Sequence, residues 1–347
     1  MLFDFVYPNC WDALKASELP VVLYGMGNGA DKTLDEFEKH RIKAAGVMAS
    51  DGFVRHQEFR GFTVKSEKEL TKELGSFTVA LCFASSLPDV MAYIENVSKR
   101  HEMIIPNVPV VGTDILDDHF LSENREDIEK AYALLADEAS KKVFKGALHF
   151  FYTGRLHYLK EIESSKEEAY ADILKLKDER YLDLGAYRGD TVEEFLRFSD
   201  GYEHITAVEP NPKNFAKLQT YAGSIPNTAL LNAGISESPG VMYISKKSGR
   251  MAALNDQNGA EVAVTSVDEI DRSPTYIKTD IEGFEERMLN GAKETLKTKP
   301  KLNLAAYHRT GDFFRLILQI NRLNPDYMIY LRKHPYIPCW DLNIYAV

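Results

Sequence analysis

Apolar and polar positions alternate in two rhythms along the chain. Short runs of consecutive apolar residues predict buried strands, and segments with an apolar residue at every third or fourth position predict helices. The order strand, helix, strand recurs from Pro20 to Ile105 and again from Tyr181 to Ala346. This alternation is typical of α/β proteins with a mostly parallel sheet. We therefore predict two α/β units in one chain.

The first unit, residues 1–113, is expected to be a small Rossmann-like α/β domain. Its first strand, Pro20–Tyr24, is followed by the glycine loop Gly25–Gly29, a polar helix and a second strand that ends near Asp51. A glycine loop after one strand and an acid after the next are typical of nucleotide sites. The third glycine comes one position too early for the usual spacing. Packing and nucleotide binding therefore both stay open as roles for this loop.

Residues 114–168 are expected to form a helical connector. Apolar residues recur at helical steps from Ile128 to Ala139, and an aromatic run extends from His149 to Tyr152. Two interpretations remain open. The helices either pack between the two α/β units, or they form a cap that contacts the substrate.

Residues able to bind a ligand gather at the start of the second unit. A strand that carries Asp183 runs into a turn between Gly185 and Gly189, and Glu209 ends the next strand. A carboxylate at that place binds the ribose hydroxyls in doubly wound folds. Tyr187 replaces the middle glycine of a pyrophosphate loop, and Asp183 would repel a pyrophosphate but attract an ammonium or sulfonium group. The pattern favours S-adenosylmethionine over NAD, with glycines that serve only close packing as the structural alternative.

Polar residues also end two later strands. Asp280 and Glu282 follow the strand Tyr276–Thr279, and His308 follows the strand Leu302–Ala306. Because the carboxyl ends of adjacent parallel strands meet, the three side chains are expected to converge on one reaction centre. With a reference pKa of about 6.5, His308 is the expected general base. A divalent cation held by the three residues is the less favoured alternative, and helix capping and a structural histidine are the non-catalytic ones.

These motifs resemble the FkbM family of methyltransferases. The resemblance is carried by Asp183-x-Gly185-Ala186-x-x-Gly189, Glu209-Pro210, Val267-Asp268-Glu269, and Lys278-Thr279-Asp280-Ile281-Glu282-Gly283-x-Glu285 with Gly291. Members of the family are S-adenosylmethionine-dependent enzymes, mostly O-methyltransferases that act on natural products and sugars. The resemblance implies that residues 169–347 form a Rossmann-like class I methyltransferase domain with a seven-stranded, mostly parallel sheet.

The resemblance implies that Asp183, Gly185 and Glu209 bind the cofactor and that Asp280 and Glu282 line the reaction centre, and the positions of the motifs on the strands add further candidates. The side chains expected in catalysis are those of His308, Asp280 and Glu282. The residues expected to bind S-adenosylmethionine are Asp183, Gly185, Ala186, Tyr187, Gly189, Thr191, Glu209, Asn232 and Asp280. In addition, Thr191 or Asp190 is expected to cap the helix Val192–Phe198 through a side-chain oxygen.

Composition narrows the choice of partners and compartment. The formal net charge of −10 argues against a nucleic-acid partner. Cys10, Cys82 and Cys339 lack metal-ligand spacing and fit reduced thiols of a cytoplasmic protein. No signal-like segment or long apolar run predicts secretion or a membrane span. A small-molecule or saccharide acceptor is expected, and a homo-oligomer stays open.

Three classes of function follow from the sequence. The first is an S-adenosylmethionine-dependent O-methyltransferase. The second is a nucleotide-dependent oxidoreductase or epimerase that uses the Gly25–Gly29 loop, and the third is a non-catalytic S-adenosylmethionine-binding scaffold. Two basic groups could face an acidic acceptor or form a solvated surface. Their members are Lys246, Lys247, Arg250, Arg332, Lys333 and His334.

Overall fold

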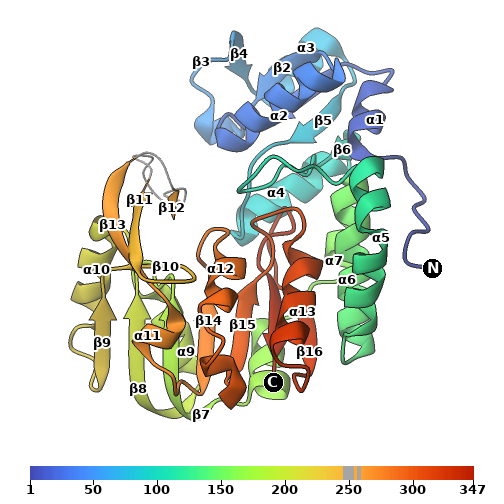
Figure 1. The fold of residues 1–347 in the computed structure, drawn as a ribbon. Coiled ribbons are helices and arrows are strands. Elements are labelled where there is room, and N and C mark those ends of the chain that lie inside the picture. The colour runs from blue at the N-terminus through green and yellow to red at the C-terminus, as the bar shows by residue number, and fades with distance from the viewer. Residues whose placement is uncertain (245–253, 256–258) are drawn as a thin grey trace.

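The computed structural model describes residues 1–244, 254–255 and 259–347. It contains a six-stranded sheet near the N-terminus, a seven-stranded sheet in the C-terminal half and a small four-stranded sheet. Figure 1 shows the six-stranded sheet above the seven-stranded one, with helices α5 and α6 along one side. Lys246, Lys247 and Arg250 lie outside the described residues.

The N-terminal sheet has the order β3-β4-β2-β1-β5-β6. Its strands are β1 (Val21–Tyr24), β2 (Ala44–Met48), β3 (Glu58–Phe59), β4 (Phe62–Lys65), β5 (Thr78–Leu81) and β6 (Met103–Ile104). Its helices are α1 (Cys10–Lys15), α2 (Asn28–His40), α3 (Glu67–Leu74) and α4 (Pro88–Ser98). The sequence did not predict the β3–β4 hairpin, because strands this short carry too few apolar positions to show a period.

The helices after the first sheet pack against the second one. They are α5 (Asp118–Ala133), α6 (Glu138–Thr153), α7 (Leu156–Lys160), α8 (Lys166–Glu168) and a π-helical turn, Ala169–Leu174. The side chains of Asp117 and Asp137 cap α5 and α6 by accepting backbone N–H groups of their first turns. Isolated bridges join Leu135 and Glu163 to the edge strand β16 (Ile329–Lys333). The connector therefore covers an edge that would otherwise expose unpaired backbone groups.

The large sheet has the order β16-β17-β15-β14-β7-β8-β9. Its other strands are β7 (Lys177–Leu184), β8 (Asp200–Val208), β9 (Thr228–Leu231), β14 (Tyr276–Thr279), β15 (Lys301–Ala305) and β17 (Leu342–Ala346). All neighbours are parallel except β17, which runs antiparallel to β15 and to β16. The predicted mostly parallel, seven-stranded sheet is confirmed.

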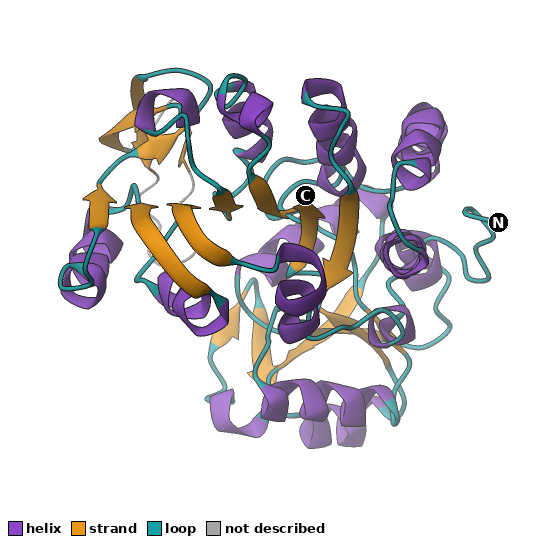
Figure 2. Ribbon diagram, turned by 90° about the horizontal axis from the view of Figure 1, so that it is seen from below, coloured by secondary structure: helices purple, strands orange, loops and turns teal. Residues whose placement is uncertain are grey.

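Helices cover both faces of this sheet, as Figure 2 shows from below. They include α9 (Asp190–Phe198), α10 (Pro212–Ala222), α11 (Val267–Ile270), α12 (Glu285–Asn290) and α13 (Asp312–Leu323), with a 3-10 turn at Thr295–Thr298. The four-stranded sheet consists of β10 (Gly234–Ile235), β11 (Gly240–Ile244), β12 (Leu254–Asn255) and β13 (Ala260–Thr265). The middle strands β7 and β14 are buried on both faces, as expected of a doubly wound fold.

The basic run from Arg332 to His334 makes internal contacts. Arg332 pairs with Asp137 at 2.6 Å, and the fully buried Lys333 pairs with Glu163 at 3.1 Å. His334 is buried as well. Arg332 and Lys333 thus tie the edge strand to the connector. They do not form the solvated surface that the sequence favoured.

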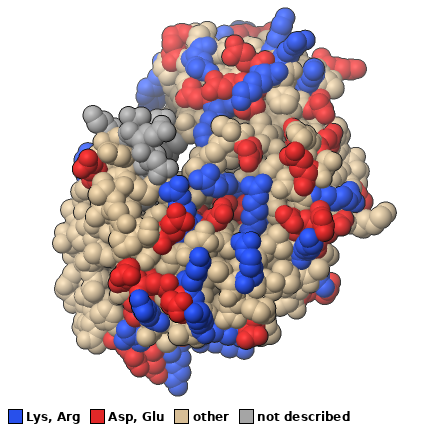
Figure 3. Space-filling view, in the orientation of Figure 1, with Lys and Arg blue, Asp and Glu red and all other residues tan. Residues whose placement is uncertain are grey.

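Three further findings concern the surface charge, membrane spans and the cysteines. Figure 3 shows acidic and basic side chains interspersed on the face that it displays. Within the described part of the chain, no helix combines the length and the apolar character needed to cross a membrane. The thiols of Cys10, Cys82 and Cys339 are free and buried.

An aromatic cluster joins α6 to α13. The ring of Phe313 lies 5.0 Å from that of Phe144 and 5.4 Å from that of Phe151, and Phe313 is buried. We expect Phe313→Ala to lower the free energy of unfolding by about 3–5 kcal/mol, because it leaves a cavity between the helices. Urea titration followed by circular dichroism measures this. The exposed Met328→Ala is the control, expected within about 0.5 kcal/mol of wild type. A similar small change for Phe313→Ala would contradict the packing.

Candidate active site

The two α/β units share one cavity of about 680 Å³. The segments after β1 and β5 contribute its wall on the N-terminal side, and the segments after β7, β8, β14 and β15 contribute the opposite wall. In each sheet the strand order reverses direction at one point. This point lies between β1 and β5 in the six-stranded sheet and between β7 and β14 in the seven-stranded sheet. Ligands of open α/β sheets bind at such switch points. The cavity is therefore the candidate active site.

The loop after β7 touches the end of β14. Gly185 has φ +87°, and a Cβ there would lie 2.0 Å from the carbonyl oxygen of Asp280. Gly189 has φ +101°, and a Cβ there would meet the Tyr221 ring at 2.4 Å. Side chains at these two positions would push the loop away from the strand end and from α10. The predicted sharp turn thus depends on both glycines.

Asp183 lies beneath this loop and does not face the cavity. It is fully buried, and Thr191 Oγ1 donates a hydrogen bond to its carboxylate. Burial raises its pKa to about 6, although the charge of Lys278 and the bond from Thr191 oppose the shift. The prediction that Thr191 or Asp190 caps α9 is wrong. The N-cap residue is Gly189, which has no side chain to accept a hydrogen bond, and the Thr191 hydroxyl is bonded to Asp183.

Glu209 stands at the end of β8, beside the loop. Its two carboxylate oxygens accept N–H groups from Asn211 at 2.8 Å and from Tyr187 at 3.0 Å. Burial raises the pKa of Glu209 to about 7, and these two bonds oppose the shift. Asn232 does not line the cavity. It donates to the carbonyl oxygens of Glu209 and Pro210, and so holds the turn that carries the carboxylate.

Asp280, Glu282 and His308 converge as predicted. His308 Nε2 lies 3.2 Å from Asp280 Oδ1 and 3.7 Å from Glu282 Oε2. Its Nδ1 lies 3.0 Å from Glu285 Oε1 on α12. Tyr307 donates a hydrogen bond to the other oxygen of Asp280. The imidazole is therefore held between carboxylates at both ring nitrogens.

These contacts shift the pKa values of His308 and Asp280 in opposite directions. Burial by itself lowers the pKa of His308, but the charges of Glu285 and Asp280 and their hydrogen bonds outweigh it and hold the pKa well above 6.5. In return, the pKa of Asp280 is lowered, because the contact with His308 outweighs its burial. The expectation of a free, neutral imidazole near pH 7 does not agree with these contacts. The cluster nevertheless has the donors for a cation, since one ligand atom each of Asp280, Glu282 and His308 lie within 4.8 Å of one another.

The predicted cofactor residues divide into two groups. Those that line the cavity are Gly185, Tyr187, Thr191, Glu209 and Asp280. Those that lie behind it and support the wall are Asp183, Ala186, Gly189 and Asn232. Sequence analysis did not assign roles to the lining residues Lys166, Lys278, Asn303 and Trp340. Asn303 had a recognisable signal, because it interrupts an apolar strand as Asp183 does.

The N-terminal glycine loop opens into the same cavity. Gly27, Gly29 and Lys32 line it, whereas the exposed Asp51 does not. A Cβ at Gly29 would lie 2.3 Å from the carbonyl oxygen of Cys82, so this glycine serves close packing. An acid placed like Asp51 cannot complete a ribose site in this cavity. The contacts therefore favour packing over dinucleotide binding for the loop.

Comparison with known proteins identifies the C-terminal half. Residues 183–337 match the model of the methyltransferase FkbM domain. These residues form an FkbM methyltransferase domain. This assignment supports a methyltransferase, in agreement with the resemblance found in the sequence. The search of curated proteins found no match.

Solved structures extend the similarity to the whole fold. Methyltransferase FkbM from Methylobacillus flagellatus KT is 21% identical, with a TM-score of 0.73 over 99% of this chain and 94% of that one. Precorrin-6y C5,15-methyltransferase from Geobacter metallireducens GS-15 is 15% identical over 52% of this chain and 84% of that one, with a TM-score of 0.34. Fibrillarin from Aeropyrum pernix was solved with natively bound S-adenosyl-L-methionine. It is 15% identical over 52% of this chain and 71% of that one, with a TM-score of 0.34. The first similarity covers both sheets and shows the fold.

The two glycine loops offer a matched pair of substitutions. Gly185→Ala should lower the free energy of unfolding by about 1–3 kcal/mol, because the residue has positive φ and its Cβ would overlap β14. Gly27→Ala should stay within about 0.5 kcal/mol, since no atom lies within 4 Å of a Cβ at that position. Urea denaturation of both variants tests this. Equal stability of the two variants would mean that the Gly185 loop does not lie against the end of β14.

Proposed function

We propose that this protein is an S-adenosylmethionine-dependent O-methyltransferase that acts on a hydroxyl of a small molecule or saccharide. The observation that carries the proposal is the placing of Glu209 and the Asp280–Glu282 pair on either side of the Gly185 loop in one cavity. A ribose-binding acid therefore lies on one side of the FkbM loop, and carboxylates able to accept a hydroxyl proton lie on the other.

The residues present fit this cofactor. Gly185 lets the loop lie against the end of β14, and backbone N–H groups orient both oxygens of Glu209. Ribose hydroxyls would donate to Glu209, and Asp183 beneath the loop would attract the positive charge. When bound, the cofactor supplies an electrophilic methyl group on sulfur.

On the acceptor side, we assign separate roles to the three converging residues. Asp280 and Glu282 are part-exposed, with 38% and 30% of their side chains accessible, whereas His308 is 1% exposed. Asp280, whose pKa is lowered, would accept a hydrogen bond from the acceptor hydroxyl, and Glu282 would receive its proton. His308 would act as a positioning residue that holds Asp280. A divalent cation bound by the same three residues is the alternative, in which the metal would lower the pKa of the hydroxyl.

The experiment that tests the function has two stages. Isothermal titration calorimetry first measures binding of S-adenosylmethionine, S-adenosylhomocysteine and, for comparison, NAD(P). Release of S-adenosylhomocysteine is then followed with a panel of sugars and other small hydroxyl compounds. Binding of NAD(P) without S-adenosylhomocysteine would overturn the proposal. Cofactor binding without turnover on any hydroxyl would favour the scaffold interpretation.

Glu209 generates a prediction about pH. Its pKa of about 7 means that the carboxyl is largely protonated in mildly acidic buffer. Since ribose needs the ionised acceptor, the Kd for S-adenosylhomocysteine should rise as pH falls, approaching about tenfold per unit below the pKa. Glu209→Gln should weaken binding about 10- to 100-fold at pH 8 and remove most of this dependence. Calorimetry between pH 6 and 8 measures both effects, and a flat wild-type profile would contradict the ribose role.

Glu282 generates a prediction about turnover. Once an acceptor is found, Glu282→Gln should lower kcat about 10²- to 10⁴-fold, because a proton acceptor is lost. Affinity for S-adenosylhomocysteine should be retained. The exposed Glu286→Gln, on the same segment, is the matched control and should behave like wild type. EDTA separates the two versions of the site: loss of activity that Mg²⁺ or Mn²⁺ restores would establish the cation, and undiminished activity would establish the metal-free version.

A further inference from the structure

Three polar residues form a row across the middle of the seven-stranded sheet. In the strand register, Lys278 of β14 stands opposite Asp183 of β7 on one side and opposite Asn303 of β15 on the other. Partners in register point to the same face of a sheet, so the three side chains lie next to one another. Lys278 and Asn303 also line the cavity. Lys278 and Asn303 therefore form part of the cavity floor, two residues below the strand end that carries Asp280, and Asp183 continues the row outside the cavity lining.

Two polar atoms of this floor, Lys278 Nζ and Asn303 Oδ1, have no hydrogen-bond partner among the described residues. Lys278 is 9% exposed, and its ammonium makes no hydrogen bond or close ion pair with any described residue, although its charge acts on Asp183 and Asp280. Asn303 is 4% exposed, and its Oδ1 accepts no hydrogen bond. Its amide nitrogen donates a long bond of 3.4 Å to the Tyr276 hydroxyl. Buried groups without partners are costly, and in a native protein they usually have a partner.

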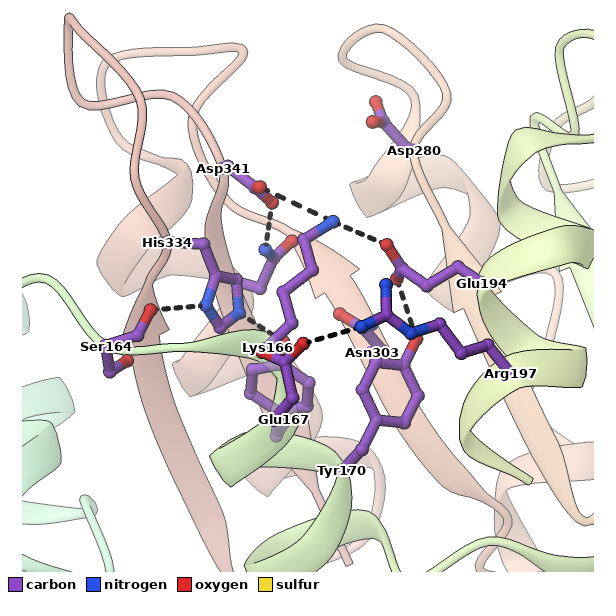
Figure 4. A network of polar contacts seen from close by, with 12 residues as sticks. Ser164, Lys166, Glu167, Tyr170, Glu194, Arg197, Asp280, Asn303, His334 and Asp341 are labelled. Atoms are coloured by element: carbon purple, nitrogen blue, oxygen red, sulfur yellow. Dashed lines mark hydrogen bonds and ion pairs between the residues drawn. The ribbon is translucent and has the colours of Figure 1, made fainter. Parts of the chain in front are cut away.

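The other lysines of the cavity wall are engaged. Lys166 reaches between Glu194, at 2.7 Å, and Asp341, at 3.5 Å, as Figure 4 shows. Lys32 donates to the carbonyl oxygens of Pro109 and Val110 at 2.7 and 2.8 Å. Of these three lysines, Lys278 is the one whose ammonium has no hydrogen bond to a described residue and can bind an anionic ligand. The acid nearest to it in register, Asp183, already accepts the hydroxyl of Thr191.

The donors and acceptors of the floor match an α-amino acid. The Lys278 ammonium can pair with a carboxylate. The Asn303 amide oxygen can accept a hydrogen bond from a protonated amine. Glu209 ends β8, two strands away from β14, with the Gly185 loop between them. One ligand with a ribose at one end and an amino-acid group at the other would span this distance along the sheet edge.

We propose that Lys278 and Asn303 bind the amino-acid end of the cofactor. The carboxylate pairs with Lys278 Nζ, and the ammonium donates to Asn303 Oδ1. This assignment rests on the proposed S-adenosylmethionine dependence and adds to it the residues that distinguish the complete cofactor from a plain thionucleoside. It also gives the lysine of the Lys278-Thr279-Asp280 motif a role in binding, two residues before the reaction centre.

The test compares two ligands that differ in the amino-acid end. S-Adenosylhomocysteine carries the amino-acid group, and 5′-methylthioadenosine lacks it while keeping adenosine and the sulfur. In calorimetry, Lys278→Met should weaken S-adenosylhomocysteine about 10- to 100-fold and leave 5′-methylthioadenosine within about twofold. Asn303→Leu should act in the same direction. The exposed Lys293→Met is the control for loss of one positive charge and should change neither affinity.

A third ligand isolates the carboxylate. Decarboxylated S-adenosylmethionine keeps the amine, so its affinity should be insensitive to Lys278→Met but sensitive to Asn303→Leu. Retained binding of 5′-methylthioadenosine shows that each variant is folded. Unchanged affinity for S-adenosylhomocysteine in Lys278→Met, or equal weakening of both ligands, would overturn the assignment and point to an anionic group of the acceptor. Failure of the wild-type protein to bind any of the three ligands would instead refute the proposed function.

Discussion

The active site depends on the contact between the Gly185 loop and the end of β14. At this contact the backbone of one strand end lies against the backbone of the next, with no room for a side chain. The contact brings Glu209, held by the N–H of Tyr187, and Asp280 to the same cavity. A larger residue at position 185 would move Glu209 and Asp280 apart. Glycine is needed there for space as well as for its positive φ.

Around this contact, the pKa values of similar carboxyl groups shift in opposite directions. Asp183 and Glu209 are buried with neutral hydrogen-bond donors, and their pKa values rise. Asp280 lies against a histidine, and its pKa falls. The difference follows from the charge of the partner, because a cation stabilises the ionised form more than burial destabilises it. The cavity thereby keeps Asp280 in its ionised form.

The cavity also explains why two α/β units occur in one chain. The described lining residues that come from residues 1–113 include no acid, whereas the opposite wall carries Asp190, Glu194, Glu209, Asp280 and Asp341 among others. Each wall alone would be an open sheet edge; together they enclose a space in which solvent is restricted. We propose that the N-terminal domain ends at residue 113 and the connector at residue 168. The connector packs on β16 and α13, so it belongs structurally with the FkbM sheet.

The sequence by itself determined the order of strands and helices in the FkbM half, the glycine turn, and the convergence of Asp280, Glu282 and His308. These follow from local rules: apolar runs form strands, and residues at the carboxyl ends of parallel strands meet. Only the tertiary structure decided how the side chains are used. Thr191 bonds Asp183 instead of capping α9, Glu285 lies beside His308, and the Lys278 ammonium makes no hydrogen bond to any described residue. Each outcome depends on a neighbour distant in the chain, and hydrogen bonding and charge act through space, which a local pattern does not record.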